Sequence, residues 1–347
     1  MYIKRILLFI LLAGLVAGSI FAYMVYGAIF SPNTAFDNDE AYLYIPSDSG
    51  FGEVKELLSP LLEDLDSFEQ VADRKGYAAN IKPGKYAIKR GMNNNEIINS
   101  LRSANIPVKV AFNNQETLAD LAGRISMQIE PDSSSLLRAF QEDDFLKANG
   151  FNDDTKLAMY LPNSYEFFWN TSPEKFRDRM LTEYKTFWND SRLEKAKSQN
   201  LKPNEVIALA SIVHKETAKV EERPRVAGLY LNRLRKGMLL QADPTVIYSM
   251  KKRSGNFDLV IKRVLYKDLE LDSPYNTYKY AGVPPGPITM PDITAIDAVL
   301  SPEKHDYIYM VANVEDFGYH KFAETAAQHN RNKVQYIRWI NEQKINR

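Results

Sequence analysis

The stretch Val206-Ile-Ala-Leu-Ala-Ser-Ile-Val-His-Lys-Glu216-Thr217 says more about the fold than any other part of this sequence. Leu209, Val213 and Glu216 have the i, i+4, i+7 spacing of one helix face, which predicts a helix whose last turn carries a carboxylate on its apolar side. Burial disfavours the charged carboxylate and raises its pKa. A carboxylic acid that stays protonated near neutral pH can act as a general acid. The competing interpretation is a helix-end glutamate that lies in solvent or pairs with a basic residue.

Composition excludes several classes of protein. The 347 residues include 44 basic and 44 acidic side chains, a formal net charge of zero. This balance argues against a nucleic-acid-binding protein that depends on a basic surface, but it is compatible with a glycan partner. The absence of cysteine excludes disulfides, thiolate zinc sites and cysteine nucleophiles. The four histidines do not have metal-ligand spacing, so we expect neither a metal ion nor another cofactor.

The N-terminus has the features of a membrane anchor. Lys4 and Arg5 precede an uncharged stretch, residues 6–30, that is longer than the roughly 20 residues needed to cross a bilayer. Since no convincing cleavage site follows, we expect an uncleaved, single-pass signal anchor. The positive-inside rule keeps residues 1–5 in the cytoplasm and places the rest outside the cytoplasmic (inner) membrane, on the periplasmic or extracytoplasmic side. The alternative is a cleaved signal peptide, which implies the same export.

Turn signals and periodicity divide the rest of the chain. The polar residues 31–42 are predicted as a linker. Residues 43–106 mix strand and helix patterns, including an Asn-capped amphipathic helix near Glu96, and suit a small α+β module. From 107 on, a strand and a helix lead into a mostly helical region that ends with a predicted buried strand at 307–312. We therefore predict an α+β protein: an N-terminal transmembrane helix, a small module, and a larger mixed α+β domain over 107–347.

Several separated motifs occur in a recognisable order. They are the Glu216 segment, Asn232-Arg233-Leu234, a loop with Gln241, Asp243 and Pro244, Tyr275-Asn276-Thr277-Tyr278, the Pro- and Gly-rich loop 282–288, and His320-Lys-Phe322 with His329-Asn330. Over essentially the whole chain they closely resemble the endolytic murein transglycosylases, the MltG or YceG-like family. The resemblance includes the single anchor and a LysM-like region, here residues 43–106, before the catalytic domain.

The resemblance implies a lyase, a lytic transglycosylase that cuts peptidoglycan glycan strands internally. Its bond is the β-1,4 link between N-acetylmuramic acid and N-acetylglucosamine, and its product carries a 1,6-anhydro end. The family's catalytic glutamate matches Glu216. The resemblance also implies action on nascent strands, as a terminator of their elongation, near peptidoglycan synthases (penicillin-binding proteins). In this chemistry Glu216 protonates the leaving oxygen, the muramic C6 hydroxyl attacks C1, and Glu216 then takes that hydroxyl's proton.

Four further residues are candidates for substrate binding. Gln241 and Asp243 lie in a Pro-restricted loop and would bind sugar hydroxyls or N-acetyl groups, although Asp243 could instead cap the helix that opens at Pro244. Asn276 and Tyr278 would hold N-acetyl groups or stack on a ring, and the alternative is loop packing. Arg233 is predicted to pair with an acid such as Glu222 rather than touch substrate.

One position departs from the family. His214 stands where relatives commonly have an acidic residue. It is two residues from Glu216, so on a helix it points to another side, and we expect it in solvent or at the rim of the site.

Two other functions stay open on the sequence alone. A hydrolase that uses water would need a second acid, for which Asp243 is the best candidate. A non-enzymatic, membrane-anchored scaffold would bind glycan without cutting it, but a binder has no need for a buried acid at 216. The LysM-like module would bind glycan or act only as a spacer.

Overall fold

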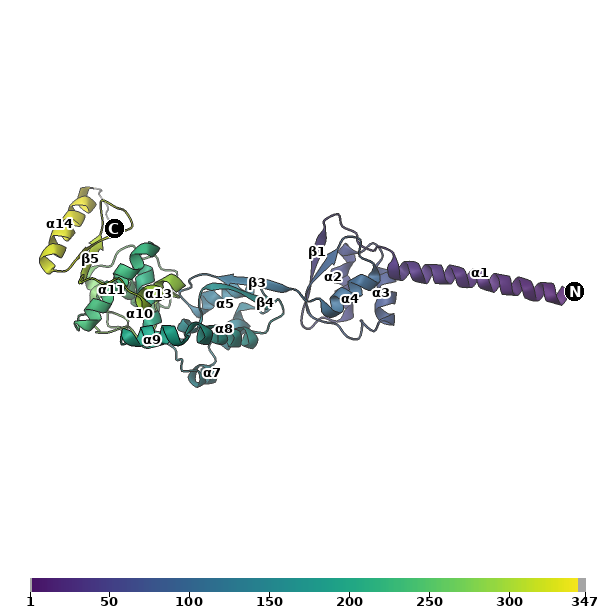
Figure 1. The fold of residues 1–347 in the computed structure, drawn as a ribbon, viewed down its shortest axis with the longest axis horizontal. Helices are drawn as coiled ribbons and strands as arrows, with labels where there is room; N and C mark the ends of the chain where they lie inside the picture. Colours follow the sequence, from purple (N-terminus) through teal and green to yellow (C-terminus); the bar gives the residue numbers. More distant parts are fainter. Residues whose placement is uncertain (1, 343–347) are drawn as a thin grey trace. The chain divides into compact units, whose positions relative to one another are not determined.

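The computed structural model describes residues 2–342, and in it the chain forms two compact units (Figure 1). The first contains the N-terminal helix and the chain up to Val110, together with residues 127–131 and 165–172. The second contains residues 111–126, 132–164 and the chain from Pro173 on. Helices and two-stranded sheets alternate in both, which confirms the predicted mixed α+β class.

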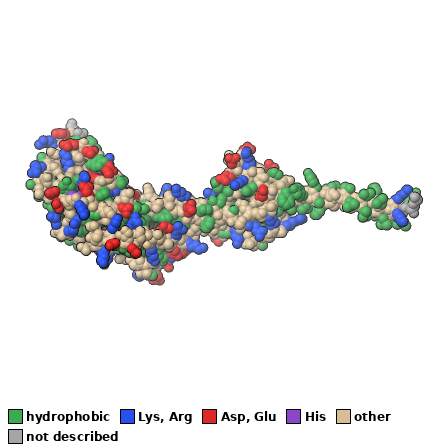
Figure 2. Space-filling view, viewed as in Figure 1, with side chains coloured by type: hydrophobic (Ala, Val, Ile, Leu, Met, Phe, Trp, Pro, Cys, Tyr) green, Lys and Arg blue, Asp and Glu red, His purple; other side chains and the backbone are tan. Residues whose placement is uncertain are grey.

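The N-terminal helix α1, Tyr2–Phe30, is long and apolar enough to cross a membrane. None of its residues is buried, and hydrophobic side chains cover most of the face seen in Figure 2. At about 1.5 Å per residue a helix of 29 residues is about 43 Å long, which exceeds the roughly 30 Å of a hydrocarbon core. The helix is therefore longer than the predicted span and begins before Lys4 and Arg5.

The small module of the first unit is built on one antiparallel strand pair. β1, Glu40–Ile45, pairs with β2, Gly84–Lys89, in a register that sets Leu43 opposite Tyr86. Three helices cover the buried face of this pair: α2 (Phe51–Leu58), α3 (Leu65–Arg74) and α4 (Asn94–Ser103). Alternate strand residues point into their core, as the period of two requires. Gly84 has φ +146°, and a Cβ there would meet the Asn105 amide at 2.5 Å.

The residues between α1 and β1 are packed rather than free. Asn33, in the segment predicted as a linker, is buried, and its amide donates to the Asp64 carbonyl at 2.8 Å and to Asn94 Oδ1 at 2.7 Å. Asn94, 1 % exposed, donates in turn to the Ala28 carbonyl of α1 at 2.8 Å. A capping box between Asn93 and Glu96 begins α4 at this position. Side-chain amides thus join the last turn of α1 to the module.

The second unit is organised around helix α10, Pro203–Glu216. All eight residues from Val206 to Val213 are buried, because α9 (Asp190–Ser198), α11 (Arg223–Arg235), α12 (Asp243–Ser254) and α13 (Ile293–Leu300) contact it. A helix that is apolar on every side belongs at the centre of a core. Its start is fixed by Pro203 and by the Glu205 carboxylate, which accepts from the Lys202 N–H at 2.7 Å.

The remaining elements complete the two units. The chain runs through β3 (Pro107–Phe112), α5 (Leu118–Ser126), α6 (Ser133–Phe140), α7 (Asp143–Ala148), β4 (Asn163–Phe168) and α8 (Pro173–Phe187), and it ends with β5 (Tyr309–Ala312), β6 (His320–Ala323) and α14 (Ala326–Glu342). β3 pairs with β4, and the division between the units passes through both strands. β5 pairs with β6 in antiparallel register. The prediction of a fully buried strand at 307–312 is wrong: β5 is half-buried because its side chains also line a cavity.

We predict that Asn94→Ala loosens the junction between α1 and the module. The substitution leaves the Ala28 carbonyl and the Asn33 amide without their partner, at a cost of about 1–3 kcal/mol for each buried polar group. Hydrogen exchange of the full chain in detergent should show faster exchange in α4 and around Asn33, and no change in α10. Asn80→Ala, at an exposed site, is the control. Equal exchange in both variants would contradict the structural role of Asn94.

Candidate functional site

Glu216, the last residue of α10, opens onto a polar cavity of about 240 Å³ in the second unit. α11 contributes Tyr230 and Arg233 to its wall, and β5 and β6 contribute residues 310–312 and His320. The loop before α12 and the first turn of that helix supply Gln241 and Asp243, and Tyr278 completes the lining. Three of the four predicted substrate-binding residues therefore surround the predicted catalytic acid.

Burial raises the pKa of Glu216 above its ordinary value. A hydrogen bond from Tyr230 Oη to Oε1, 2.6 Å long, and the positive charge of His320 oppose this rise, while the charge of Asp243 adds to it. Within residues 2–342 no group other than Tyr230 hydrogen-bonds to this carboxyl group, so Oε2 remains available to a ligand. The site thus holds an acid that keeps its proton more readily than an exposed glutamate and has a free oxygen.

The sequence gives little signal for Tyr230 or for the pairing of His320. Tyr230 faces the core like its neighbours Val226 and Ala227, and nothing in the pattern separates it from a packing tyrosine. His320 donates its backbone N–H to Glu222 Oε1 at 2.7 Å, and its Nδ1 lies 3.0 Å from Oε2. Burial alone would lower the pKa of His320, but Glu222 and then Glu216 raise it, which favours a cationic ring beside the cavity.

Arg233 does not pair with Glu222, so that prediction is wrong: Glu222 is taken by His320 instead. Arg233 donates to the backbone carbonyl of Ile308 at 2.6 Å and to that of Leu240 at 2.7 Å. A planar guanidinium has donors in several fixed directions, so it can satisfy two separate loops at once. Arg233 therefore positions both the approach to β5 and the loop that carries Gln241.

The loop at Gln241 is held in a strained conformation. Gln241 has φ +49°, a left-handed backbone that typically costs about 1–3 kcal/mol for a residue other than glycine. Two hydrogen bonds maintain it, from the Gln241 N–H to the Thr277 carbonyl and from the Ala242 N–H to Thr277 Oγ1, both 3.0 Å. Asp243 is the first residue of α12, and its carboxylate accepts from Tyr278 Oη at 2.6 Å rather than from a backbone N–H of the helix.

Asn276 is the one predicted binding residue that does not line the cavity. It is fully buried, and its amide donates to the carbonyls of Leu269 and Leu271 at 2.9 and 2.7 Å. Its Oδ1 accepts from the Tyr278 N–H at 3.0 Å. These bonds use the amide group inside the protein, so Asn276 shapes the loop that presents Tyr278.

The pattern of the YceG-like family matches residues 43–335, most of the described chain. The chain belongs to the YceG-like family. Over 317 residues it is 29% identical to a protein of Bacillus subtilis named endolytic murein transglycosylase, and the match covers 86% of this chain and 85% of that protein. A Streptococcus pneumoniae protein with the same name is 35% identical over 187 residues, 52% of this chain and 32% of its own length.

A solved structure agrees with this membership. The crystal structure of a yceG-like protein from Listeria monocytogenes is 27% identical, with a TM-score of 0.56, and the match covers 85% of this chain and 99% of that one. The family resemblance noted in the sequence is therefore confirmed.

His214, the departure from the YceG-like pattern, points away from the cavity. Its Nδ1 lies 3.3 Å from Asp292 Oδ2, and the same carboxylate oxygen accepts from Arg223 Nη1 at 2.9 Å. The His214 side chain is only 16% exposed, so the expectation of a solvated residue is wrong. Burial lowers the pKa of His214, and Asp292 opposes this. The residue holds α10 near the start of α13 and takes no part in the cavity.

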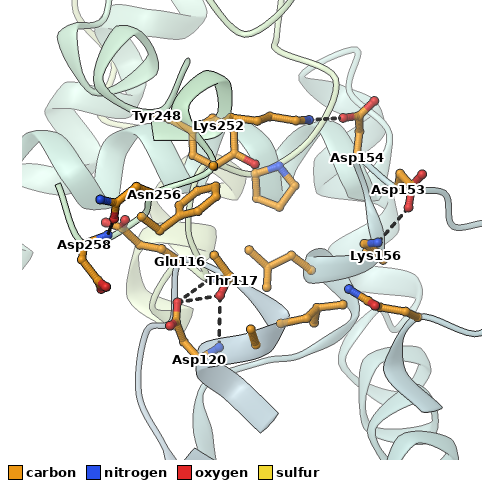
Figure 3. A pocket seen from close by; sticks show the side chains of 17 residues that line it. Glu116, Thr117, Asp120, Asp153, Asp154, Lys156, Tyr248, Lys252, Asn256 and Asp258 are labelled. Atoms are coloured by element: carbon orange, nitrogen blue, oxygen red, sulfur yellow. Dashed lines mark hydrogen bonds and ion pairs between the residues drawn. The ribbon is translucent and has the colours of Figure 1, made fainter. Parts of the chain in front are cut away.

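A larger cavity of about 740 Å³ in the same unit shares no lining residue with the Glu216 cavity (Figure 3). Three of its acids pair with lysines: Asp153 with Lys156 at 2.7 Å, Asp154 with Lys252 at 2.8 Å, and Glu116 with Lys215 and Lys251 at 2.5 and 2.6 Å. Burial alone would raise the pKa of Glu116, but the two lysines lower it. A carboxylate with a lowered pKa is a poor proton donor near neutral pH, whereas the smaller cavity holds the carboxyl group with the raised pKa and is therefore the candidate active site.

We predict that Glu216→Gln stabilises the fold at neutral pH. The pKa of Glu216 is higher in the folded protein than in the unfolded chain, so the folded protein binds this proton more tightly. The folded state therefore loses stability as pH rises from the unfolded pKa through the folded pKa. The variant lacks this loss, and we expect a gain of about 1 kcal/mol at neutral pH, typical of substitutions that relax an active site, and no gain below about pH 4. Thermal unfolding across pH measures the difference. Glu205→Gln, which removes a carboxylate at the other end of the same helix, is the control and should not stabilise the fold at neutral pH.

We also predict that Tyr230→Phe raises the pKa of Glu216 further. The tyrosine hydroxyl donates to the carboxylate and so stabilises its charged form. Carbon-13 NMR titration of glutamate-labelled protein should show the Glu216 carboxyl titrating at higher pH in the variant. Tyr280→Phe, which removes an exposed hydroxyl bonded to Asp272, should leave it unchanged. An unaltered Glu216 titration in Tyr230→Phe would contradict this role for Tyr230.

Proposed function

We propose that this YceG-like protein is a membrane-anchored, endolytic lytic transglycosylase of peptidoglycan, with Glu216 as its catalytic acid and base. The observation that carries the proposal is a carboxyl group with a raised pKa and one free oxygen in a polar cavity. The relatives named endolytic murein transglycosylase support the substrate. The bond cut is the β-1,4 link between N-acetylmuramic acid and N-acetylglucosamine inside a glycan strand.

In the first half of the reaction Glu216 donates its proton to the glycosidic oxygen as that bond breaks. The free oxygen Oε2 is the one that faces an incoming sugar, since Tyr230 holds Oε1. Positive charge develops at C1 as the leaving group departs. Proton loss makes Glu216 an anion, and its bond from Tyr230 together with the cationic His320 stabilises that anion.

In the second half the Glu216 carboxylate takes the proton of the muramic C6 hydroxyl while that oxygen bonds to C1. This closes the 1,6-anhydro ring and returns Glu216 to its protonated form. Because the nucleophile belongs to the substrate, the reaction needs no second carboxylate and no water. The cavity supports a mechanism with a single carboxyl group, since it combines one acid of raised pKa with donors that stabilise its carboxylate form.

Gln241, Asp243 and Tyr278 are proposed to bind the sugars on either side of the scissile bond. All three line the cavity, and Gln241 and Asp243 are exposed. Amides, carboxylates and phenols suit the hydroxyls and N-acetyl groups of the substrate. Asn276 is better assigned to the support of Tyr278 than to direct substrate contact.

The rest of the chain fits a protein that acts beside a membrane. We assign residues 1–5 to a cytoplasmic tail, 6–30 to the anchor, 31–42 to the linker, 43–106 to a LysM-like module and 107–347 to the catalytic domain. The apolar helix α1, with Lys4 and Arg5 at its start, supports an extracytoplasmic position for the bulk of the protein. From that position the enzyme would cut nascent strands close to the synthases and so end their elongation.

Hydrolysis by water is the second candidate, and one observation favours it. Asp243 lines the same cavity as Glu216, so a second carboxylate is present where a base that activates water would be needed. Its bond from Tyr278 holds this carboxylate in place. The two reactions differ in their products, because hydrolysis leaves a reducing end.

We predict that the full chain releases fragments with 1,6-anhydro-muramic ends from purified peptidoglycan, and that Glu216→Gln lowers this rate by at least about a hundredfold while glycan binding persists. Loss of a general acid typically lowers the reaction rate by about 10²- to 10⁴-fold. Glu205→Gln is the matched control, because glutamine keeps the capping role at the start of the same helix. Mass spectrometry of the products is the measurement.

The products also separate the competing functions. Reducing ends in place of anhydro ends would identify a hydrolase, and Asp243→Asn should then abolish cleavage as well. Binding of glycan without cleavage by either protein would identify a scaffold. Full activity of Glu216→Gln would contradict the assignment of the acid.

A further inference from the structure

A second cavity, in the first unit, lies where α1 meets the module. It has a volume of about 390 Å³ and lies between one face of α1 and the helices α3 and α4. Its two sides differ in character. The α1 side is apolar and includes Phe21, Met24 and Ile29, and the opposite side is polar or basic and includes Arg74, Lys75 and Asn95. None of these residues takes part in the proposed glycan cleavage.

The height of this cavity along α1 follows from the helix geometry, and this step rests on the proposed membrane anchor. A hydrocarbon core of about 30 Å takes roughly 20 helical residues, so a span that starts at Ile6 ends near Val25. Tyr23 and Tyr26 stand at that level, 79% and 63% exposed. Tyrosines in this position are typical of the boundary between acyl chains and head groups. Phe21 and Met24 then lie at the depth of acyl chains.

The basic wall is fixed at the level of the head groups. Asn94 donates to the Ala28 carbonyl at 2.8 Å, and Ala28 and Ile29 pack against the module core. α3 and α4 both contact α1. Because these contacts join the last turns of α1 to the module, Arg74 and Lys75 cannot leave the membrane surface without breaking them. Figure 2 shows lysine and arginine side chains on the module close to the hydrophobic helix.

The charge of this wall is not balanced by acids. Within residues 2–342, neither Arg74 nor Lys75 has a carboxylate at ion-pair distance, and the same holds for Arg102. Lys75 Nζ donates to Asn95 Oδ1 at 2.6 Å and to Asn99 Oδ1 at 2.7 Å, which leaves one of its three N–H groups free. Burial lowers the pKa of Lys75, and the charge of Arg102 lowers it further. An anion bound here would relieve this crowding of positive charge.

We propose that the cavity binds an anionic glycerophospholipid of the surrounding leaflet, with its phosphate between Arg74 and Lys75 and the upper part of an acyl chain against Phe21 and Met24. The donors match a phosphate, since a guanidinium offers paired N–H groups and an ammonium offers a point charge. Bilayer phospholipids would surround the part of α1 that lies in the membrane, so such a ligand is always adjacent to the cavity. Its binding fixes the height and the rotation of the module on the membrane.

The test uses the full chain in vesicles that contain phosphatidylcholine and phosphatidylglycerol in equal amounts. A photo-reactive benzophenone amino acid replaces Gln70, which is exposed and lines the cavity, and mass spectrometry identifies the lipid attached after illumination. We expect phosphatidylglycerol to be enriched by roughly fivefold for each cation that contacts it. Arg74→Gln should lower the enrichment about fivefold, and Arg74→Gln with Lys75→Gln should remove it.

Two controls separate a specific lipid site from a general effect of surface charge or of a disturbed fold. Lys82→Gln changes an exposed lysine of the same module that does not line the cavity, and it should leave the enrichment intact. Arg74→Gln leaves the bonds of Lys75 in place, so its effect does not depend on a disturbed fold. Attachment of both lipids in equal amounts, or of none, would overturn the proposal. So would preferential attachment of undecaprenyl pyrophosphate when that lipid is added as a minor component.

Peptidoglycan digestion by the same preparations separates this proposal from the proposed enzyme activity. Lipid selectivity without 1,6-anhydro products would support the lipid site and contradict the proposed transglycosylase activity. Anhydro products without lipid selectivity would support the transglycosylase activity and contradict the lipid site.

Discussion

The burial of α10 on every side is the constraint on which the second unit depends. Every residue from Val206 to Val213 is buried and six of the eight belong to the hydrophobic core, so the helix cannot rotate or shift without exposing apolar surface. Glu216, in the last turn, is carried by this rigid element. The raised pKa of its carboxyl group follows from its own burial at the end of this packed helix.

Hydrogen bonds from side chains to the main chain build the walls of the Glu216 cavity. Asn232 donates to the carbonyls of His305 and Tyr307, and Arg233 donates to those of Ile308 and Leu240. Close packing adds to this at Gly228, where a Cβ would meet the Glu303 carbonyl at 2.6 Å. Irregular chain segments cannot satisfy their own polar groups, and these side chains do so for them. These motif residues therefore support the small number of residues that line the cavity.

The two cavities of functional interest use charge in opposite ways. Around Glu216, the acids Glu222 and Asp243 are each held by a partner, and the one carboxyl group with a raised pKa has a free oxygen. In the cavity beside α1, Arg74 and Lys75 lie close together without a carboxylate partner among residues 2–342. The Glu216 cavity therefore favours a bound proton, and the cavity beside α1 favours a bound anion. Both sit on elements that packing has made rigid.

Local pattern alone predicted a good part of this protein. The helix that bears Glu216, the apolar N-terminal helix, the capped start of α4 and the strand 107–112 all follow from periodicity and from the chemistry of single residues. Glu216 was singled out because its place on an apolar face is visible within three turns of one helix, and the family resemblance matched it to the catalytic glutamate. Tyr278 and Gln241 were found only as members of loops, and their neighbour Asn276 could not be told from them, since amides that bind backbone and amides that bind sugars look alike in sequence.

The sequence by itself determined the class of fold, the apolar N-terminal helix and the place of the Glu216 carboxylic acid at the end of a helix, because each rests on residues close together in the chain. Only the tertiary structure decided which groups surround that acid. Tyr230 lies 14 residues and His320 about a hundred residues further on, and their distances to Glu216 and Glu222 depend on how α11 and β6 pack. The same holds for the cavity beside α1, whose lining unites residues from α1, α4 and the C-terminal end of α3. Contacts of this kind arise from the packing of many side chains at once, and no local pattern encodes them.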